Sequence, residues 1–196
     1  MPRDFDMSVK RFLRIYPLVE RSMGVVKTEV VRVYKDILNA VANEGWFSSR
    51  EFQTSVTDRW LQIWRDTWEP SVTPGCPWLH MEYYMDLTSS ASVCRLDVEP
   101  RSGPREPVAQ MARVLYDRLR TDEHSWIDNG WLMSREGDRQ VILLRKEVAW
   151  PQDESEFTAQ WVVDGAVGLL NCLAAAIPVV NGAVAELEGG RAHTRA

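Results

Sequence analysis

The hydrophobic positions of the first 48 residues recur every three or four residues, which is the spacing of one face of an α-helix. A short helix is predicted over residues 8–23, and Pro17 is expected to break or kink it. A longer helix is predicted over residues 24–44, whose apolar stripe consists of Val26, Val30, Val33, Ile37, Ala40 and Val41. Residues 1–48 are therefore predicted to form an N-terminal helical region.

The next segment contains three tryptophans at intervals of four residues. Trp60, Trp64 and Trp68 fit one face of a helix over residues 50–68, which Pro70 would end. Large aromatic side chains on one stripe usually fill a core, and here the stripe would pack the helix on a sheet. The same stripe could instead bind a protein partner. A base-stacking role is disfavoured, because such sites need a basic track and this segment mixes acids with bases.

Two later segments alternate between apolar and polar residues, as antiparallel strands do when one face of their sheet meets solvent. The polar face of residues 78–88 consists of His80, Glu82, Tyr84 and Asp86. The polar face of residues 93–100 consists of Arg95, Asp97 and Glu99. Joined by small residues, the two segments predict a hairpin with one apolar and one solvated face.

The rest of the chain extends this pattern. The further predicted elements are a helix over residues 108–120, a hairpin over 131–150 turning at 136–138, and a helix from 156 to about 176. Residues 189–196 are predicted to be a disordered tail. Residues 49–188 are thus expected to form an α+β domain, an antiparallel sheet of two hairpins, with four or five strands, and with helices packed on one face.

Residues 165–185 contain no charged side chain and are long enough to span a membrane. The stretch is nevertheless rich in alanine and glycine, and no lysine or arginine flanks it directly. We therefore expect a buried helix that ends near Pro178 rather than a membrane span. Small residues such as Gly165 and Gly168 would let another helix approach closely, either within the chain or in a homodimer.

Composition narrows the classes of function. The 196 residues are 45% hydrophobic and 26% charged, which suits a globular domain. A net charge of -5 argues against a general phosphate binder, although the N-terminal region is locally basic and could form a docking face that includes Arg11 and Arg14. Three widely spaced cysteines and the lack of a secretory signal indicate reduced thiols in a cytoplasmic protein.

The acidic residues of the first hairpin are the best candidates for chemistry. Glu82, Asp86, Asp97 and Glu99 share its polar face, and clustered carboxylates can hold a magnesium ion. A nuclease of this type also needs a lysine shortly after the second-strand acid, and none follows Asp97. The chain has no histidine metal motif, phosphate-binding glycine loop or nucleophile elbow. The sequence therefore favours a non-catalytic protein with no metal and no cofactor.

Over residues 60–180 the chain resembles the uncharacterised α+β domain that follows restriction-endonuclease-like domains in many bacterial proteins. The resemblance rests on the first strand pair, the helix VAQMARVLYDRL, Trp126, the hairpin segment RQVILLRK and the helix WVVDGAVGLLNCLAAAIP. Because the nuclease domain has no counterpart here, the resemblance implies an accessory role in a defence or mobile-element system. The order of elements is also similar to that of secretion-type chaperones, which are dimeric.

We expect a cytoplasmic, non-catalytic protein that binds a protein partner through its N-terminal helices or its exposed sheet face, with a homodimer as a further possibility. Three alternatives remain open. They are a secretion-type chaperone or immunity protein that binds one partner, a metal-dependent nuclease that uses the four carboxylates, and a phage inhibitor that mimics DNA with them. Binding to nucleic acid is not favoured, and membrane insertion is not expected.

Overall fold

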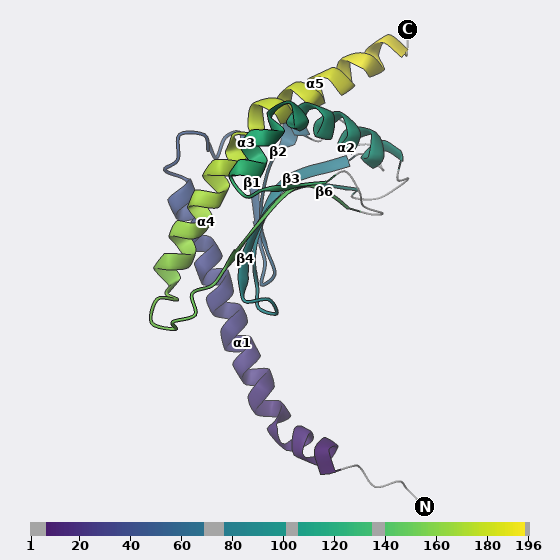
Figure 1. Ribbon diagram of the computed structural model, residues 1–196. Helices are drawn as coiled ribbons and strands as arrows, with labels where there is room; N and C mark the ends of the chain where they lie inside the picture. Colours follow the sequence, from purple (N-terminus) through teal and green to yellow (C-terminus); the bar gives the residue numbers. More distant parts are fainter. Residues whose placement is uncertain (1–6, 69–76, 101–105, 135–139, 195–196) are drawn as a thin grey trace, which may run out of the picture.

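A six-stranded antiparallel sheet forms the centre of the structure, a computed structural model that describes residues 7–68, 77–100, 106–134 and 140–194 (Figure 1). Within these ranges, the side chains of residues 7–15, 19, 77, 100, 106–108 and 188–194 are not described. The strands are β1 Phe52–Val56, β2 Leu61–Arg65, β3 Pro77–Asp86, β4 Ala91–Pro100, β5 Leu132–Met133 and β6 Val141–Ala149, in the sheet order β1-β2-β3-β4-β6-β5. The predicted α+β class is confirmed, with more strands than expected.

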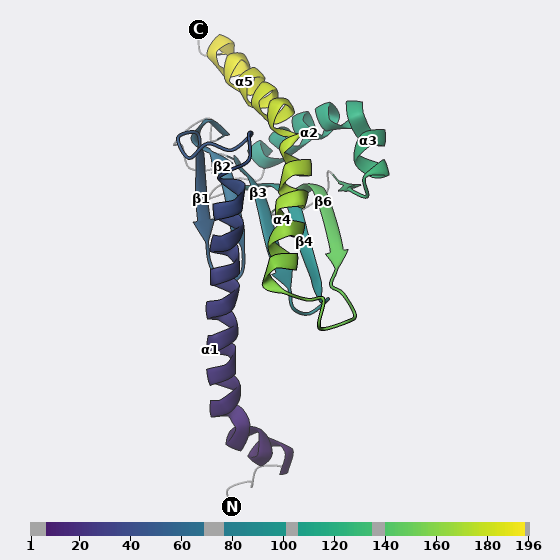
Figure 2. The ribbon, with the colours of Figure 1, turned by 90° about the vertical axis from the view of Figure 1, so that its left-hand side faces the viewer.

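The helices cover one face of this sheet (Figures 1 and 2). They are α1 Met7–Val41, α2 Glu106–Leu119, α3 Glu123–Asp128, α4 Ala159–Ala174 and α5 Ile177–Thr194. The predicted first hairpin is present as β3 and β4, in which Leu79 lies opposite Val98 and Met81 opposite Leu96. All four side chains are buried in one core with apolar residues of α1, α2, α4 and α5. Alternation along each strand therefore places the predicted apolar face beneath the helices.

α1 is one continuous helix of 35 residues, so the prediction of two separate helices, over residues 8–23 and 24–44, is wrong. A proline inside a helix removes one backbone hydrogen bond, and because Pro17 is exposed, water can satisfy the carbonyl group left free. Val30, Val33 and Ile37 are buried and pack the C-terminal half of α1 on the body. The N-terminal half projects beyond the body (Figure 2).

The helix predicted over residues 50–68 is also wrong, because this segment forms β1, a turn, β2 and a 3-10 helix at Asp66–Trp68. An interval of four residues is even, so it places side chains on one face of a strand as well as on one face of a helix. The Thr57 hydroxyl accepts hydrogen bonds from the backbone amides of Arg59 and Trp60 and fixes the turn. Beyond the turn, the chain pairs with β1 instead of continuing as a helix.

The second predicted hairpin is present as β5 and β6, with Leu132 opposite Arg145. Its predicted turn at residues 136–138 lies outside the described residues. β5 is only two residues long and lies at one edge of the sheet, and β1 forms the other edge.

α4 ends at Ala174, close to the end predicted from Pro178. α5 then begins at Ile177 with Pro178 in its first turn, where a missing backbone N–H costs little. α5 continues to Thr194, so helical backbone replaces most of the tail that was expected to be disordered. In the described part of the chain no single helix has the length and apolar character to cross a membrane, while α4 and α5 together, bent by 45°, meet that test.

Candidate functional site

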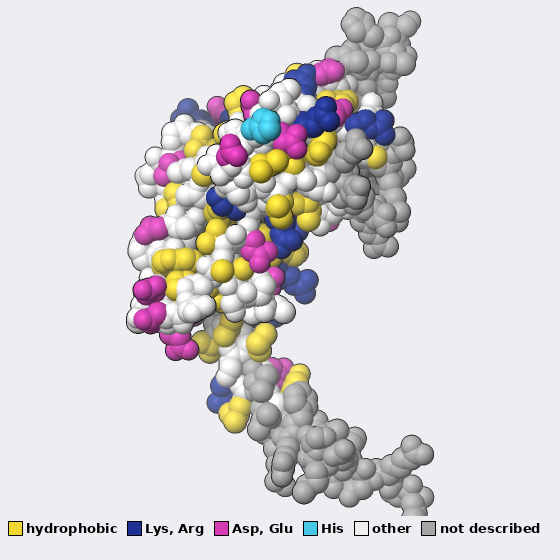
Figure 3. All heavy atoms as spheres, in the orientation of Figure 1, with side chains coloured by type: hydrophobic (Ala, Val, Ile, Leu, Met, Phe, Trp, Pro, Cys, Tyr) yellow, Lys and Arg dark blue, Asp and Glu magenta, His cyan; other side chains and the backbone are white. Residues whose placement is uncertain are grey.

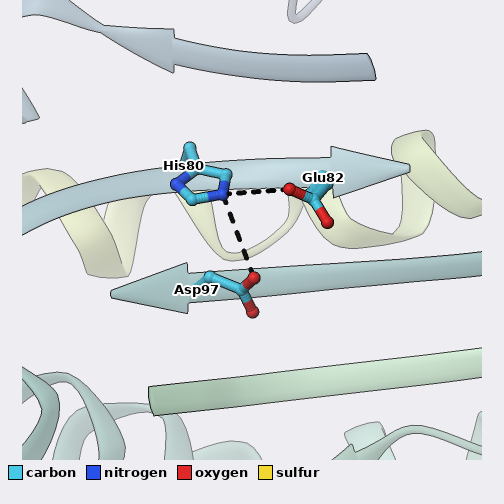
Figure 4. Close-up of side chains that lie close together, drawn as sticks. All are labelled: His80, Glu82 and Asp97. Atoms are coloured by element: carbon cyan, nitrogen blue, oxygen red, sulfur yellow. Dashed lines mark ion pairs between the residues drawn. The ribbon is translucent and has the colours of Figure 1, made fainter. Parts of the chain in front are cut away.

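A group of polar side chains lies on the sheet face opposite the helices (Figure 4). The antiparallel register places His80 of β3 opposite Asp97 of β4, and Glu82 opposite Arg95. Gln62 of β2 lies opposite Glu82 on the other side of β3. Together with one residue that precedes β6, these side chains form the polar cluster, which consists of Gln62, His80, Glu82, Arg95, Asp97 and Gln140.

The centre of the polar cluster is buried, so the predicted solvated face is wrong at this point. His80 and Asp97 are 0% exposed and Glu82 is 3% exposed. Aromatic rings lie beside the cluster: the rings of Trp78 and His80 are 4.5 Å apart, and Trp64 meets Trp78 edge-on at 5.5 Å. Alternation predicts which face a side chain occupies, but large neighbours on the same face decide whether solvent reaches it.

Arg95 balances the two buried carboxylates. Its Nη2 atom lies 2.5 Å from Glu82 Oε1, and its Nε atom lies 2.7 Å from Asp97 Oδ2, although the Nε–H is not aligned for a hydrogen bond. Gln62 Nε2 donates a hydrogen bond to Glu82 Oε2 at 2.7 Å, and Gln140 Nε2 donates one to Asp97 Oδ2 at 2.6 Å. Buried charges persist only when they are paired and hydrogen-bonded, and this network meets that requirement.

His80 turns its Nε2 atom toward both carboxylates (Figure 4). Nε2 lies 3.5 Å from Glu82 Oε2, 3.9 Å from Asp97 Oδ2 and 3.2 Å from Gln62 Nε2. Among the described residues, neither His80 Nδ1 nor Asp97 Oδ1 has a hydrogen-bond partner. Such buried unpaired atoms are uncommon in proteins.

The two carboxyl groups have opposite pKa shifts. Burial raises the pKa of Asp97 to about 8; the Arg95 charge opposes this effect and the Glu82 charge adds to it. Burial also disfavours ionisation of Glu82, but the hydrogen bond to His80, the Arg95 charge and the hydrogen bond from Gln62 together hold its pKa below the usual range. At neutral pH, Glu82 is therefore ionised and pairs with Arg95, while most Asp97 carboxyl groups keep their proton.

The polar cluster contains the donor atoms of a metal site but not a suitable charge balance. One ligand atom from each of His80, Glu82 and Asp97 lies within 4.8 Å of the others. Arg95 already supplies a cation to both carboxylates, and Asp97 would first have to lose its proton. As arranged, these side chains fit an internal ion-pair network and do not fit a metal ion.

The four predicted carboxylate candidates do not converge. Glu82 and Asp97 meet in the polar cluster, whereas Asp86 lies at the end of β3 and its Oδ1 accepts hydrogen bonds from the amides of Thr88 and Ser89. Glu99 lies nearer the other end of the hairpin, opposite Trp78. The single site that a nuclease would need from all four residues is therefore not formed.

The three predicted partner-binding tryptophans occupy different environments. Trp68 is 1% exposed in the helix-facing core, and its indole N–H donates to Asn181 Oδ1 at 2.7 Å. Trp64 is half-buried beside Trp78, and Trp60 is half-buried in the turn before β2. They form no common stripe, and Trp68 is unavailable to a partner.

A second candidate site is the surface of the α1 arm, which we define as residues 7–29. Among its described side chains, the exposed large apolar ones are Tyr16, Leu18, Met23, Val25 and Val26. Leu18 and Val25 are 62% and 61% exposed. The arm contains five basic residues against two acidic ones. The predicted partner-binding residues Arg11 and Arg14 belong to the arm, but their side chains lie outside the described residues.

A cavity of about 480 Å³ lies between the α3 region and the junction of α4 with α5, lined among others by Trp126, Trp131 and Cys172. Trp131 is 1% exposed and offers almost no ring surface to a ligand. A second hollow, of about 490 Å³, lies along α1 near Lys27 and Asp58, which form an ion pair at 3.0 Å. No member of the polar cluster lines either hollow, so neither gives a ligand access to it.

No protein-family model matches the chain, and no match was found among curated proteins or among solved structures. The sequence predicted the carboxylates but missed the roles of Gln62, Arg95 and Gln140, and it gave His80 no role. The available signal was the pairing of alternating strands: residues on the same face of neighbouring strands meet, so an arginine between two acids indicates a bridge.

Proposed function

We propose that this chain is a non-catalytic cytoplasmic protein whose function is to bind another protein chain, with the α1 arm as the docking element. The observation that carries the proposal is the unequal covering of one apolar stripe along α1. Val30 and Val33 are buried against the body, while Met23 and Val26, which continue the same spacing, are exposed. A long helix with an uncovered apolar stripe is a common element of protein recognition.

The position of the arm supports this role. The covered half of α1 is fixed to α4 by side chains as well as by the stripe: Trp46 Nε1, shortly after α1, donates to Asn171 Oδ1 at 2.6 Å, and Asn171 Nδ2 donates to Glu44 Oε2 at 3.0 Å. The arm therefore extends from a firmly anchored base. A pre-formed helix loses less conformational freedom on binding than a disordered segment would.

The polar cluster supports a non-catalytic function, because Arg95 occupies both carboxylates and the central side chains are buried. An acidic DNA mimic would need exposed carboxylates, and Glu82 and Asp97 are not exposed. An accessory role in a bacterial defence or phage system remains a prediction from the resemblance described above.

The proposal can be tested by placing a photo-cross-linking amino acid at Ser22, which is exposed one helical turn before Val26, in the full-length chain in cells that naturally produce it. We expect a discrete covalent adduct with one protein, identified by mass spectrometry, which includes the possibility of a second copy of this chain. The same amino acid at Gln110, exposed on α2, serves as the control position and should give no discrete adduct.

Substitutions on the arm test whether the adduct depends on the apolar stripe. Met23→Glu combined with Val26→Glu should abolish it, while Thr28→Glu, on the other side of the same helix, should leave it in place. Two results would contradict the proposal that the arm binds a partner. One is a mixture of many different adducts at both cross-linker positions, and the other is an adduct that the double substitution does not reduce.

A further inference from the structure

The solvent-facing side of α4 is built from small residues. Gly165, Gly168, Cys172 and Ala175 follow one another at intervals of three and four residues, and all four are exposed. A Cβ atom added to either glycine would meet nothing within 4 Å, so packing inside the chain does not require glycine there. Glycine weakens a helix interior relative to alanine. Its repeated use on this face leaves room for another helix to approach closely.

The α1 arm matches this small-residue face of α4 in size and shape. At 1.5 Å per residue, the arm is about 35 Å long and α4 about 24 Å long, so one can lie along the whole of the other. The arm presents the large side chains of Met23 and Val26 on one face, whereas the exposed residues of this face of α4 from Gly165 to Ala175 are small. The half-buried Trp161 lies one turn before them on the same face. Large side chains on one helix fill the space left by small residues on the other, which is the basis of close helix packing.

The charges of the two surfaces are also complementary. The arm has five basic residues against two acidic ones, whereas residues 30–196 have 24 acidic residues against 17 basic ones. Four exposed acidic residues lie at or shortly before the start of α4: Asp153, Glu154, Glu156 and Asp164. Figure 3 shows acidic side chains along this edge of the body. An arm lying along α4 would bring the exposed Arg21 close to these acids, while Lys27 already pairs with Asp58 of its own chain.

The arm cannot reach this face within one molecule. The C-terminal half of α1 packs beside α4 of its own chain, and the arm continues past the start of α4 and away from the body (Figure 2). Only α4 of another copy is available to it. With a two-fold axis, the arm of each copy would bind α4 of the other copy. Both arms and both α4 faces would then be occupied, so the assembly would contain two chains.

We propose that two copies of this chain form a symmetric dimer in which the α1 arm of each copy lies on the small-residue face of α4 of the other. The inference rests on the proposed function, because it names the chain that the arm binds. Met23 and Val26 of one copy cover Gly165 and Gly168 of its partner, and the basic arm pairs with the acidic residues at the start of α4.

Sedimentation velocity of the full-length chain over a range of concentrations tests this dimer. We expect a species of twice 22.5 kDa. Met23→Glu with Val26→Glu, and separately Gly168→Leu, should each weaken dimerisation by about 30-fold or more, the effect of losing a central contact. Thr28→Glu on the arm and Gln110→Leu on α2 are matched controls and should leave the dimer unchanged. Added salt should weaken the wild-type dimer.

Mixing the two deficient variants distinguishes this arrangement from pairing between two arms. The Gly168→Leu chain keeps a functional arm, and the Met23→Glu/Val26→Glu chain keeps a functional α4 face. A mixed dimer therefore retains one of the two interfaces, and a labelled mixture should associate more strongly than either variant alone. If Gly168→Leu has no effect, or if mixing restores nothing, the arm does not bind α4 and the inference is overturned.

A wild-type chain that stays monomeric at all concentrations would also overturn the inference. The cross-linking experiment then decides about the proposed function separately: an arm-dependent adduct with a different protein would preserve it. Binding of the monomer to vesicles containing anionic lipid, lost in the Met23→Glu/Val26→Glu variant, would instead assign the arm to a membrane surface and overturn both.

Discussion

At the scale of single residues, Asp97 shows how a β-sheet can accommodate a buried carboxyl group. The three largest influences on its carboxyl group are burial, the Arg95 guanidinium and the Glu82 charge. Because Arg95 can fully balance only one negative charge, the cluster is most stable when one carboxyl is protonated. The shifts assign that proton to Asp97 and leave Glu82 ionised.

This assignment predicts a particular dependence of stability on pH. The pKa of Asp97 is raised from 3.8 to about 8 on folding, so the folded state binds more protons than the unfolded state between these values. Its contribution to stability is complete below pH 3.8 and is lost as the pH rises toward 8, by up to about 1.4 kcal/mol per pH unit. Urea unfolding of wild type and Asp97→Asn from pH 5 to pH 9 measures this contribution as the difference between the two.

Asparagine does not ionise, so the stability of Asp97→Asn relative to wild type should increase steadily from pH 5 to pH 8 and then level off. The lowered pKa of Glu82 acts in the opposite direction and only at acid pH, where stability falls as Glu82 takes up a proton. Parallel stability curves for the two proteins across the range would show that Asp97 is ionised when folded.

Replacing Arg95 should lower the free energy of unfolding far more than replacing Arg145, an arginine on the neighbouring strand β6. Arg95→Met leaves the buried Glu82 charge without its partner, which typically costs about 3–5 kcal/mol. Arg145→Met is the matched control, because Arg145 pairs at 2.7 Å with the exposed residue Glu147 two positions along the same strand. Such a pair contributes at most about 1 kcal/mol. Equal losses in chemical denaturation would mean that the polar cluster does not depend on Arg95.

At the scale of elements, the sequence predicted periodicity better than it predicted the kind of element. The β3–β4 hairpin, α2 and α4 were predictable because each has many residues in one repeating pattern. The β1–β2 region was not, because an interval of four between tryptophans fits both periods and the Thr57 turn gives a weak signal. The polar cluster was only partly predictable: its acids follow from strand alternation, but their burial and the packing of Trp78 on His80 do not.

The tryptophans provide a direct test of the strand assignment. A helical stripe would make Trp60, Trp64 and Trp68 equally important, whereas the structure buries only Trp68 fully. Trp68→Ala should cost about 3–5 kcal/mol and also breaks the bond to Asn181. Trp60→Ala, in the turn, should cost clearly less, which a comparison of denaturation midpoints would show. A loss at Trp60 as large as that at Trp68 would contradict the placement of these residues.

At the scale of the whole molecule, α1 links the compact body to a surface beyond it. The apolar spacing along α1 was predictable from the sequence, as was the local basic charge. What the sequence did not indicate is where the body stops covering the stripe, because this depends on where α4 begins relative to α1 in space. Pro17 does not end the helix, because α1 continues through it. The division of α1 into a covered half and an exposed arm is therefore a property of tertiary packing.

Two substitutions on the same stripe should separate these halves. Val33 is 8% exposed and Val26 is 40% exposed, although they are seven residues apart on one face of one helix. Val33→Glu places an unpaired charge in the core and should lower the free energy of unfolding by several kcal/mol. Val26→Glu should change it by less than about 1 kcal/mol when unfolding is measured at concentrations too low for association. Association between chains should show the opposite ranking of the two variants. At concentrations where both variants are folded, Val26→Glu should weaken association more than Val33→Glu does. A large loss of monomer stability in Val26→Glu would place the boundary of the body farther toward the N-terminus and would remove this part of the arm as a docking surface.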